Sequence, residues 1–141
     1  MPDLTLPEAQ TILAATFAKG TELGLKPLTV AILDAGGHLK AFQRADDTGI
    51  VRPSIAIGKA WTALGLRAPS RVVQDMAPDR PHFVAALGTM TGGNMVPAAG
   101  GVLIVKDGAV VGAVGVTGDL PEQDEACALA GVAAAGHSTA L

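Results

Sequence analysis

The stretch from Gly100 to Gly131 constrains this chain most, because it joins a glycine-rich hairpin to a helix start marked by acidic residues. Two β-branched runs, 102–105 and 110–116, flank a Lys-Asp-Gly turn, a pattern that predicts a β-hairpin. Pro121 and the acids that follow it predict a helix to Ala135, since negative charge is stabilised at a helix N-terminus. The C-terminal part is therefore expected to be a hairpin followed by a helix.

The N-terminal part carries the same two elements in the opposite order. A Thr-x-x-Glu capping box begins at Thr5, and apolar residues recur at helical spacing until Gly24. Two short runs, 28–33 and 38–43, flank the glycine turn at 34–37 and read as strands. These residues predict a helix and then a second β-hairpin.

The middle of the chain is more polar and less regular. A polar loop at 44–49 precedes two predicted helices, Pro53 to Gly65 and Pro69 to Met76. The segment 77–99 is rich in Pro, Gly and Met, so we predict an irregular loop with at most a short helix at 83–87. Loops of this length often border a binding site.

This order of elements predicts an α/β protein of the α+β type, in which helices pack on an antiparallel sheet. A length of 141 residues is usual for a single domain, so we expect one domain over 1–141. Only 16% of the residues are charged, against 49% hydrophobic. So little charge favours a homo-oligomer that buries apolar surface between subunits; the alternative is a compact, alanine-rich monomer.

Several classes of partner are disfavoured. A net charge of −3 argues against nucleic-acid binding, and 3% aromatic residues offer no base-stacking platform. No apolar run reaches the roughly 20 residues that span a bilayer, so we expect no membrane partner. The one cysteine, Cys127, excludes an intramolecular disulfide and a cysteine-only metal site. We expect a cytoplasmic protein with no bound metal ion of its own.

Three stretches are specific in their order and spacing. They are VAILDAGGHL at 30–39, IGKAWTA at 57–63, and a third that combines GGV from Gly100, the 107–108 turn, GAVGVTG at 112–118 and QDE at 123–125. With these stretches the chain resembles the GlcG/HbpS-like family, which is similar to the C-terminal domain of PduO. The resemblance extends over nearly the whole chain.

The resemblance implies a fold and a class of function. The fold is a profilin-like α/β/α sandwich around a five-stranded antiparallel sheet, often assembled as a homo-oligomer. The function is a small-ligand role, since some members bind haem and others are encoded beside genes of glycolate or diol catabolism.

Haem iron needs an axial donor, most often histidine. In haem-binding relatives a histidine of the first helix is a plausible ligand, but the helix from Thr5 to Gly24 contains none. The chain has no tyrosine, so other donors must come from elsewhere. They are His38, His82 and His137, and the thioethers of Met90 and Met95, although loop methionines often only fill packing gaps.

Three charged residues are candidates for chemistry. Lys59 lies in an apolar helix, where it would bind a substrate carboxylate or act as a base; alternatively its stem crosses the helix and its ammonium reaches solvent. Arg44 and Asp46 follow a strand, where the guanidinium would bind an anion that Asp46 helps to orient. The alternative is a solvated ion pair of little energetic value.

The acids Glu122, Asp124 and Glu125 first indicate a helix N-terminus. Alternatively Asp124 or Glu125 turns inward to pair with Lys59 or Arg44, and mutual repulsion raises one pKa enough for acid/base work.

Two functions follow. The first is an accessory or sensor protein that binds haem, another tetrapyrrole or a small metabolite. The second is a small enzyme of organic-acid catabolism that performs proton transfer or isomerisation with Lys59, Arg44 and Glu125. The ligand-binding candidates for the first are His38, Asp46, His82, Met95, Gly100, Gly101 and Asp124, of which the two glycines are expected mainly to allow a positive φ and close backbone approach.

Overall fold

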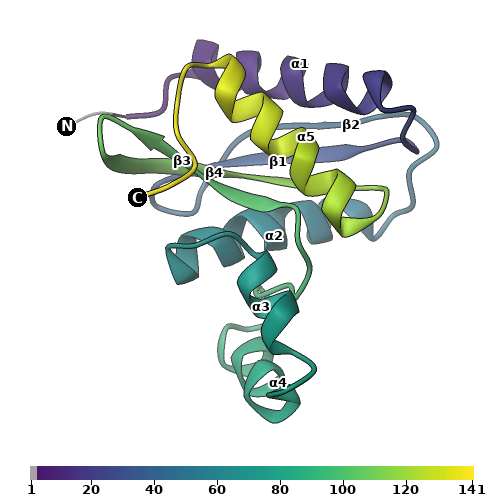
Figure 1. The fold of residues 1–141 in the computed structure, drawn as a ribbon, viewed down its shortest axis with the longest axis vertical. Coiled ribbons are helices and arrows are strands. Elements are labelled where there is room, and N and C mark those ends of the chain that lie inside the picture. Colours follow the sequence, from purple (N-terminus) through teal and green to yellow (C-terminus); the bar gives the residue numbers. More distant parts are fainter. Residues whose placement is uncertain (1–2) are drawn as a thin grey trace.

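The computed structural model describes residues 3–141, which build a four-stranded antiparallel sheet with helices on both faces (Figure 1). The order across the sheet is β2-β1-β4-β3, so two hairpins meet where β1 pairs with β4. The strands are β1 (Thr29–Asp34), β2 (Leu39–Arg44), β3 (Gly101–Lys106) and β4 (Ala109–Thr117).

Two helices cover one face of the sheet and one helix covers the other (Figure 1). α1 (Leu6–Glu22) and α5 (Pro121–Ala134) pack on each other and on the first face, whereas α2 (Arg52–Leu66) packs on the second. Two short helices, α3 (Arg71–Met76) and α4 (Pro81–Met90), extend away from the sheet on the α2 side. Of the helices formed by residues 3–141, none has the length and apolar character to cross a membrane.

The core has one apolar cluster on each face of the sheet. Ile32 and Leu33 are neighbours in β1 but belong to different clusters, since successive strand residues point to opposite faces. Burial on both faces explains why β1 and β4 read as continuous apolar runs. Gly115 lets α2 approach closely, because a Cβ at this position would lie 1.9 Å from the carbonyl oxygen of Ala56.

Most predicted elements are confirmed. The capping box of α1 forms, with Thr5 Oγ1 accepting from the Glu8 N–H at 3.2 Å and Glu8 accepting from the Thr5 N–H at 3.0 Å. The α+β class, both hairpins and the helix after the second hairpin are also found.

The expectation of five strands was wrong, because residues 3–141 form a sheet of four. The segment after α5 reaches the edge of β3 at one residue only, where Ser138 exchanges two backbone hydrogen bonds with Val105 at 2.7 and 3.0 Å. The Ser138 hydroxyl then accepts from the N–H of Ala140 at 3.0 Å. This local turn takes the chain away from the sheet before a strand can form.

The expectation for 77–99 is confirmed in part: 77–80 and 91–99 are turns and loop, but the helix between them is longer than expected. Pro81 opens a helix of ten residues, α4, which contains the short helix expected at 83–87. Gly92 and Gly93, with φ of +66° and +83°, end it. No residue of α4 is fully buried: Val84 and Leu87 are half-buried, and Phe83 and Met90 are exposed.

Candidate functional site

A buried ion pair joins α2 to the start of α5. Lys59 Nζ donates to the carbonyl oxygen of Val116 at 2.9 Å and to Asp124 Oδ2 at 3.2 Å. The two side chains are only 3% and 1% exposed. Burial lowers the pKa of Lys59 and raises that of Asp124, and the attraction between the two charges opposes both shifts. The pair lies where a ligand from solvent does not reach it.

Backbone groups pack closely around this pair. Asp124 Oδ1 accepts from the N–H of Asp119 at 2.9 Å, so both carboxylate oxygens are engaged. Gly100 and Gly101 lie directly on Lys59, because a Cβ at Gly101 would fall 2.0 Å from the Lys59 carbonyl oxygen. Close approach therefore accounts for these glycines, and Gly100 also has a φ of +130°.

Glu125 points to a different neighbour. It is Asp124 that meets Lys59, whereas Glu125 Oε2 lies 3.2 Å from Arg71 Nε of α3. The two groups are close but not aligned as a hydrogen bond, since Glu125 Oε2 has no donor with suitable geometry. The expected catalytic partners Lys59 and Glu125 thus serve separate contacts.

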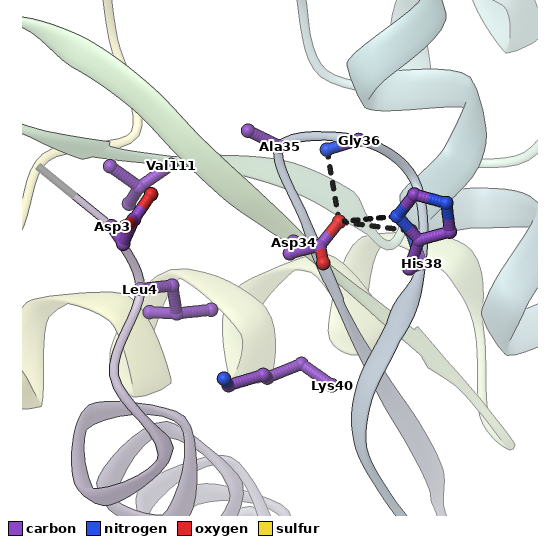
Figure 2. A pocket seen from close by; sticks show the side chains of 8 residues that line it. All are labelled: Asp3, Leu4, Asp34, Ala35, Gly36, His38, Lys40 and Val111. Carbon is purple, nitrogen blue, oxygen red and sulfur yellow. Dashed lines mark hydrogen bonds and ion pairs between the residues drawn. The ribbon is translucent and has the colours of Figure 1, made fainter. Parts of the chain in front are cut away.

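A pocket of about 380 Å³ lies between the chain before α1 and the turn that joins β1 to β2 (Figure 2). We call it the hairpin pocket. Leu4 and Val111 form the apolar part of its wall. Three polar side chains at or next to the ends of β1 and β2 also line it. These are Asp34, His38 and Lys40, and Asp3 of the chain before α1 is a fourth polar residue of the lining.

Asp34 organises the turn at this pocket. Its Oδ1 accepts from the N–H groups of Gly36 and His38 at 2.9 and 3.0 Å, and lies 3.4 Å from His38 Nδ1. Burial acts to raise the pKa of Asp34, but the donated hydrogen bonds and the imidazole outweigh it and leave the pKa below its ordinary value. Asp34 is therefore an anion that holds one side of the imidazole.

The His38 ring has its other nitrogen free. Its side chain is 81% exposed, and Figure 2 shows the second ring nitrogen directed away from Asp34. Histidines that bind metal commonly donate their remaining N–H to a carboxylate, which fixes the ring and its tautomer. Asp34 Oδ1 lies on the Nδ1 side of the His38 ring, at 3.4 Å and as an ion-pair contact without the alignment of a hydrogen bond. The Lys40 ammonium adds a positive charge at the same pocket, and the Asp3 carboxylate adds a negative one.

The other end of the same hairpin carries Arg44 and Asp46. Both are exposed and line a hollow of about 380 Å³ at the loop after β2. No ion pair within residues 3–141 joins them. Arg44 lies at this outer loop and Lys59 is buried on α2, so Lys59, Arg44 and Glu125 do not gather in one pocket.

The other donors expected for haem are distributed over the molecule. His82 is exposed on α4, whereas Met95 is buried with 9% exposure. His137 contacts Glu8 through Nε2 and its side chain is 12% exposed. Met90 is exposed on α4.

Sequence reasoning missed Asp34 and Lys40 as members of a site. The signal was present, because an Asp four residues before a His across a glycine turn brings carboxylate and imidazole together. Asp34 was interpreted only as a turn residue.

The family model described as haem degrading protein HbpS-like matches residues 4–133. Protein GlcG of Escherichia coli is 34% identical over 113 residues, which are 77% of this chain and 80% of that protein. An uncharacterised 15.0 kDa protein of Citrobacter freundii, from the dhaT-dhaS intergenic region, is 32% identical over 122 residues, 86% of this chain and 84% of that one. The corrinoid adenosyltransferase PduO of Salmonella typhimurium is 30% identical over 108 residues, but the match covers only 32% of its length.

Solved structures share the fold. The crystal structure of a PduOC:heme complex superposes with a TM-score of 0.90 and 26% identity, covering 99% of this chain and all of that one. The crystal structure of HbpS gives a TM-score of 0.80 and 27% identity, covering 94% and 90%.

Proposed function

Because the chain belongs to the haem degrading protein HbpS-like family, we propose that it is a small-ligand-binding protein that holds haem, or another tetrapyrrole, through His38 at the hairpin pocket. One observation carries the proposal: His38 is exposed, with one ring nitrogen facing a carboxylate and the other free. The similarity to a haem complex over nearly the full chain supports the choice of ligand.

Among the possible axial donors in residues 3–141, His38 at the hairpin pocket suits haem iron best. His137 uses Nε2 for its contact with Glu8, and Met95 is buried in packing. His82 lies on α4 without a carboxylate beside it among the ion pairs of the described residues. His38 alone combines a free nitrogen, an orienting acid and an adjoining pocket.

Each residue of the pocket has a definite part in this proposal. His38 would offer the lone pair of its free ring nitrogen to the haem iron, and the Asp34 carboxylate would favour the proton on the other nitrogen. The Lys40 ammonium would neutralise a carboxylate of the ligand, while Leu4 and Val111 would offer apolar contact. Bound haem would supply an iron centre for redox or oxygen chemistry.

A cytoplasmic homo-oligomer is part of the proposal. Large apolar side chains are exposed just before α2, on α4 and just before α5, and a second subunit would bury them. The most exposed are Ile50 at 96%, Met90 at 75% and Leu120 at 64%.

The enzyme of organic-acid catabolism has less support. Proton transfer requires that the acid or base reach the substrate, directly or through one water. Lys59 is 2% exposed and bound to Asp124, and Arg44 and Glu125 lie at other hollows. The arrangement therefore favours binding over catalysis by these three residues.

A haemin titration followed at the Soret band tests the proposal. We expect saturable one-to-one binding, with a dissociation constant at least about tenfold higher for His38→Ala because the iron loses its donor. His82→Ala is the matched control and should bind as the wild type does. An unshifted Soret band in the wild type, or equal affinities in wild type and His38→Ala, would contradict the proposal.

A further inference from the structure

A groove runs along the other end of the β1–β2 hairpin, between α1 and the loop at 44–48. It consists of adjoining hollows of about 380, 320 and 120 Å³, all of which have Ala45 in their walls. Arg44 is shared by the two larger hollows, and Phe17 of α1 by the two smaller ones. We call these adjoining hollows together the loop groove; it lies apart from the hairpin pocket, whose turn is at the opposite end of the two strands.

The hollows of the groove differ in chemistry. The first is lined by the charged and polar side chains of Arg44, Asp46, Asp47 and Thr48. The second has Phe17 as its apolar wall. A ligand that occupies both must therefore be polar at one end and apolar at the other.

The charges of the polar hollow further restrict the chemical class of the ligand. Arg44 is a permanent cation whose planar guanidinium matches a carboxylate. The acids Asp46 and Asp47 would repel a simple anion, and Arg44 would repel a simple cation. No ion pair within residues 3–141 ties Arg44 to either acid, so both signs of charge are available to a ligand. A group that carries both a carboxylate and an ammonium satisfies all three side chains.

The loop is held in place by its own backbone contacts. The N–H of Ala45 donates to the carbonyl oxygen of Leu28 at 2.9 Å, and the Thr48 hydroxyl donates to the carbonyl oxygen of Ala45 at 3.2 Å. Asp47 has a φ of +64°, a conformation that Asp tolerates better than most residues. These contacts fix the loop that bears the charges, which lowers the entropic cost of ordering it around a ligand.

We propose that the loop groove binds a small zwitterion, an α-amino acid with an apolar side chain. Arg44 takes the carboxylate, Asp46 and Asp47 take the ammonium, and the side chain lies against Phe17. This site is independent of haem binding at His38.

Isothermal titration of the full chain with L-leucine tests the proposal, with two analogues that each lack one charge. 4-Methylpentanoate lacks the ammonium and 3-methylbutylamine lacks the carboxylate. Leucine should bind at least about tenfold more tightly than either, because each analogue loses a charge-assisted contact. Equal affinities for the three probes, or no heat with leucine, would overturn the proposal.

Variants of the chain test whether leucine binds in the loop groove. Arg44→Gln and the double change Asp46→Asn with Asp47→Asn should each weaken leucine binding at least about tenfold. Arg67→Gln and Asp79→Asn are the matched controls, since both residues are exposed and border none of the hollows of the groove. Leucine binding that Arg44→Gln leaves unchanged, or that the controls weaken equally, would place the site elsewhere and refute the assignment. A haemin titration of Arg44→Gln should match the wild type.

Discussion

Two pairs of charged side chains, Lys59–Asp124 and Asp34–His38, have similar chemistry but different roles. The first is buried and supports the fold, whereas the second is exposed and available to a ligand. Both pairs lie next to glycines, and both join a cationic or titratable nitrogen to an aspartate. The first pair is 3% and 1% exposed, whereas the second has His38 at 81% and Asp34 at 40%. The inner pair joins two helices across the end of β4, and the outer pair presents a nitrogen to solvent.

Burial makes the energetic difference. A buried ion pair loses hydration on both sides, so removal of one partner leaves an uncompensated charge inside the protein. An exposed pair contributes about 0–1 kcal/mol and can be altered without loss of the fold. Substitution of His38 is therefore expected to change ligand binding without loss of the fold, whereas substitution of Lys59 is expected to destabilise the fold.

The largest effect is expected for Lys59→Met. The change leaves Asp124 buried without its cation and should lower the free energy of unfolding by about 3–5 kcal/mol. Urea unfolding followed by circular dichroism measures it. The double variant with Asp124→Asn should recover part of the loss, because the neutral amide no longer needs a counter-charge. A loss below about 1 kcal/mol in Lys59→Met would show that the pair does not support the fold.

The glycines beside the two pairs should respond differently to alanine. A methyl group at Gly101 meets the Lys59 backbone at 2.0 Å, so Gly101→Ala should cost about 3 kcal/mol. A methyl group at Gly36 meets the His38 ring at 2.9 Å, and this exposed ring can move, so Gly36→Ala should cost less than about 0.5 kcal/mol. Unfolding free energies of the two variants decide this. Equal losses of stability in the two variants would show that Gly101 and Gly36 do not differ in how tightly they are packed.

Glu8 provides an intermediate case. It accepts from the Thr5 N–H and contacts His137 and Lys106, and its side chain is 21% exposed. The Thr5 hydrogen bond is the main reason that its pKa is lowered from 4.5 to about 2; burial opposes the shift, and His137 and Lys106 add to it. A lowered carboxyl pKa stabilises the fold above the unfolded value and loses this effect as the pH falls toward the folded value.

Glu8→Gln should therefore cost about 1–2 kcal/mol at neutral pH. The wild type should lose stability as the pH falls from about 4.5 to about 2, and the variant should lose less over that range. Unfolding free energies measured across this range test the sign. Parallel profiles for the two proteins would show that Glu8 is not the titrating group.

The smallest effect on stability is expected at the outer pair. His38→Ala should change the unfolding free energy by less than about 0.5 kcal/mol, because the ring is exposed and makes few contacts. Asp34→Asn should do more, since Asp34 also accepts from two backbone N–H groups of the turn. Unfolding of both variants in urea ranks them. A greater loss for His38→Ala would mean that the imidazole supports the turn.

The sequence predicted the helices and hairpins better than it predicted how they assemble into the fold. Caps and glycine turns act within a few residues, so the capping box at Thr5 and both hairpins could be read directly. The number of strands could not, because the course of the chain at Ser138 depends on a local turn that competes with the edge of β3. Helix α4 was predicted too short, at 83–87, because Pro and Gly in its neighbourhood suggested a loop.

The site was harder to predict for a similar reason. Which acid would reach Lys59 depended on the rotation of α5, and the structure selects Asp124 while Glu125 faces Arg71. The pairing of Asp34 with His38 was readable from spacing, but it lay in a turn whose aspartate has a structural explanation of its own. Exposure, which separates the two pairs, comes only from the packed fold.

The most direct test of this account is the haemin dissociation constant of His38→Ala, measured on protein shown by urea unfolding to be as stable as the wild type. The dissociation constant should be at least about tenfold higher than that of the wild type, with the unfolding free energy unchanged. An unchanged dissociation constant in a fully folded variant would contradict the assignment of the outer pair to ligand binding.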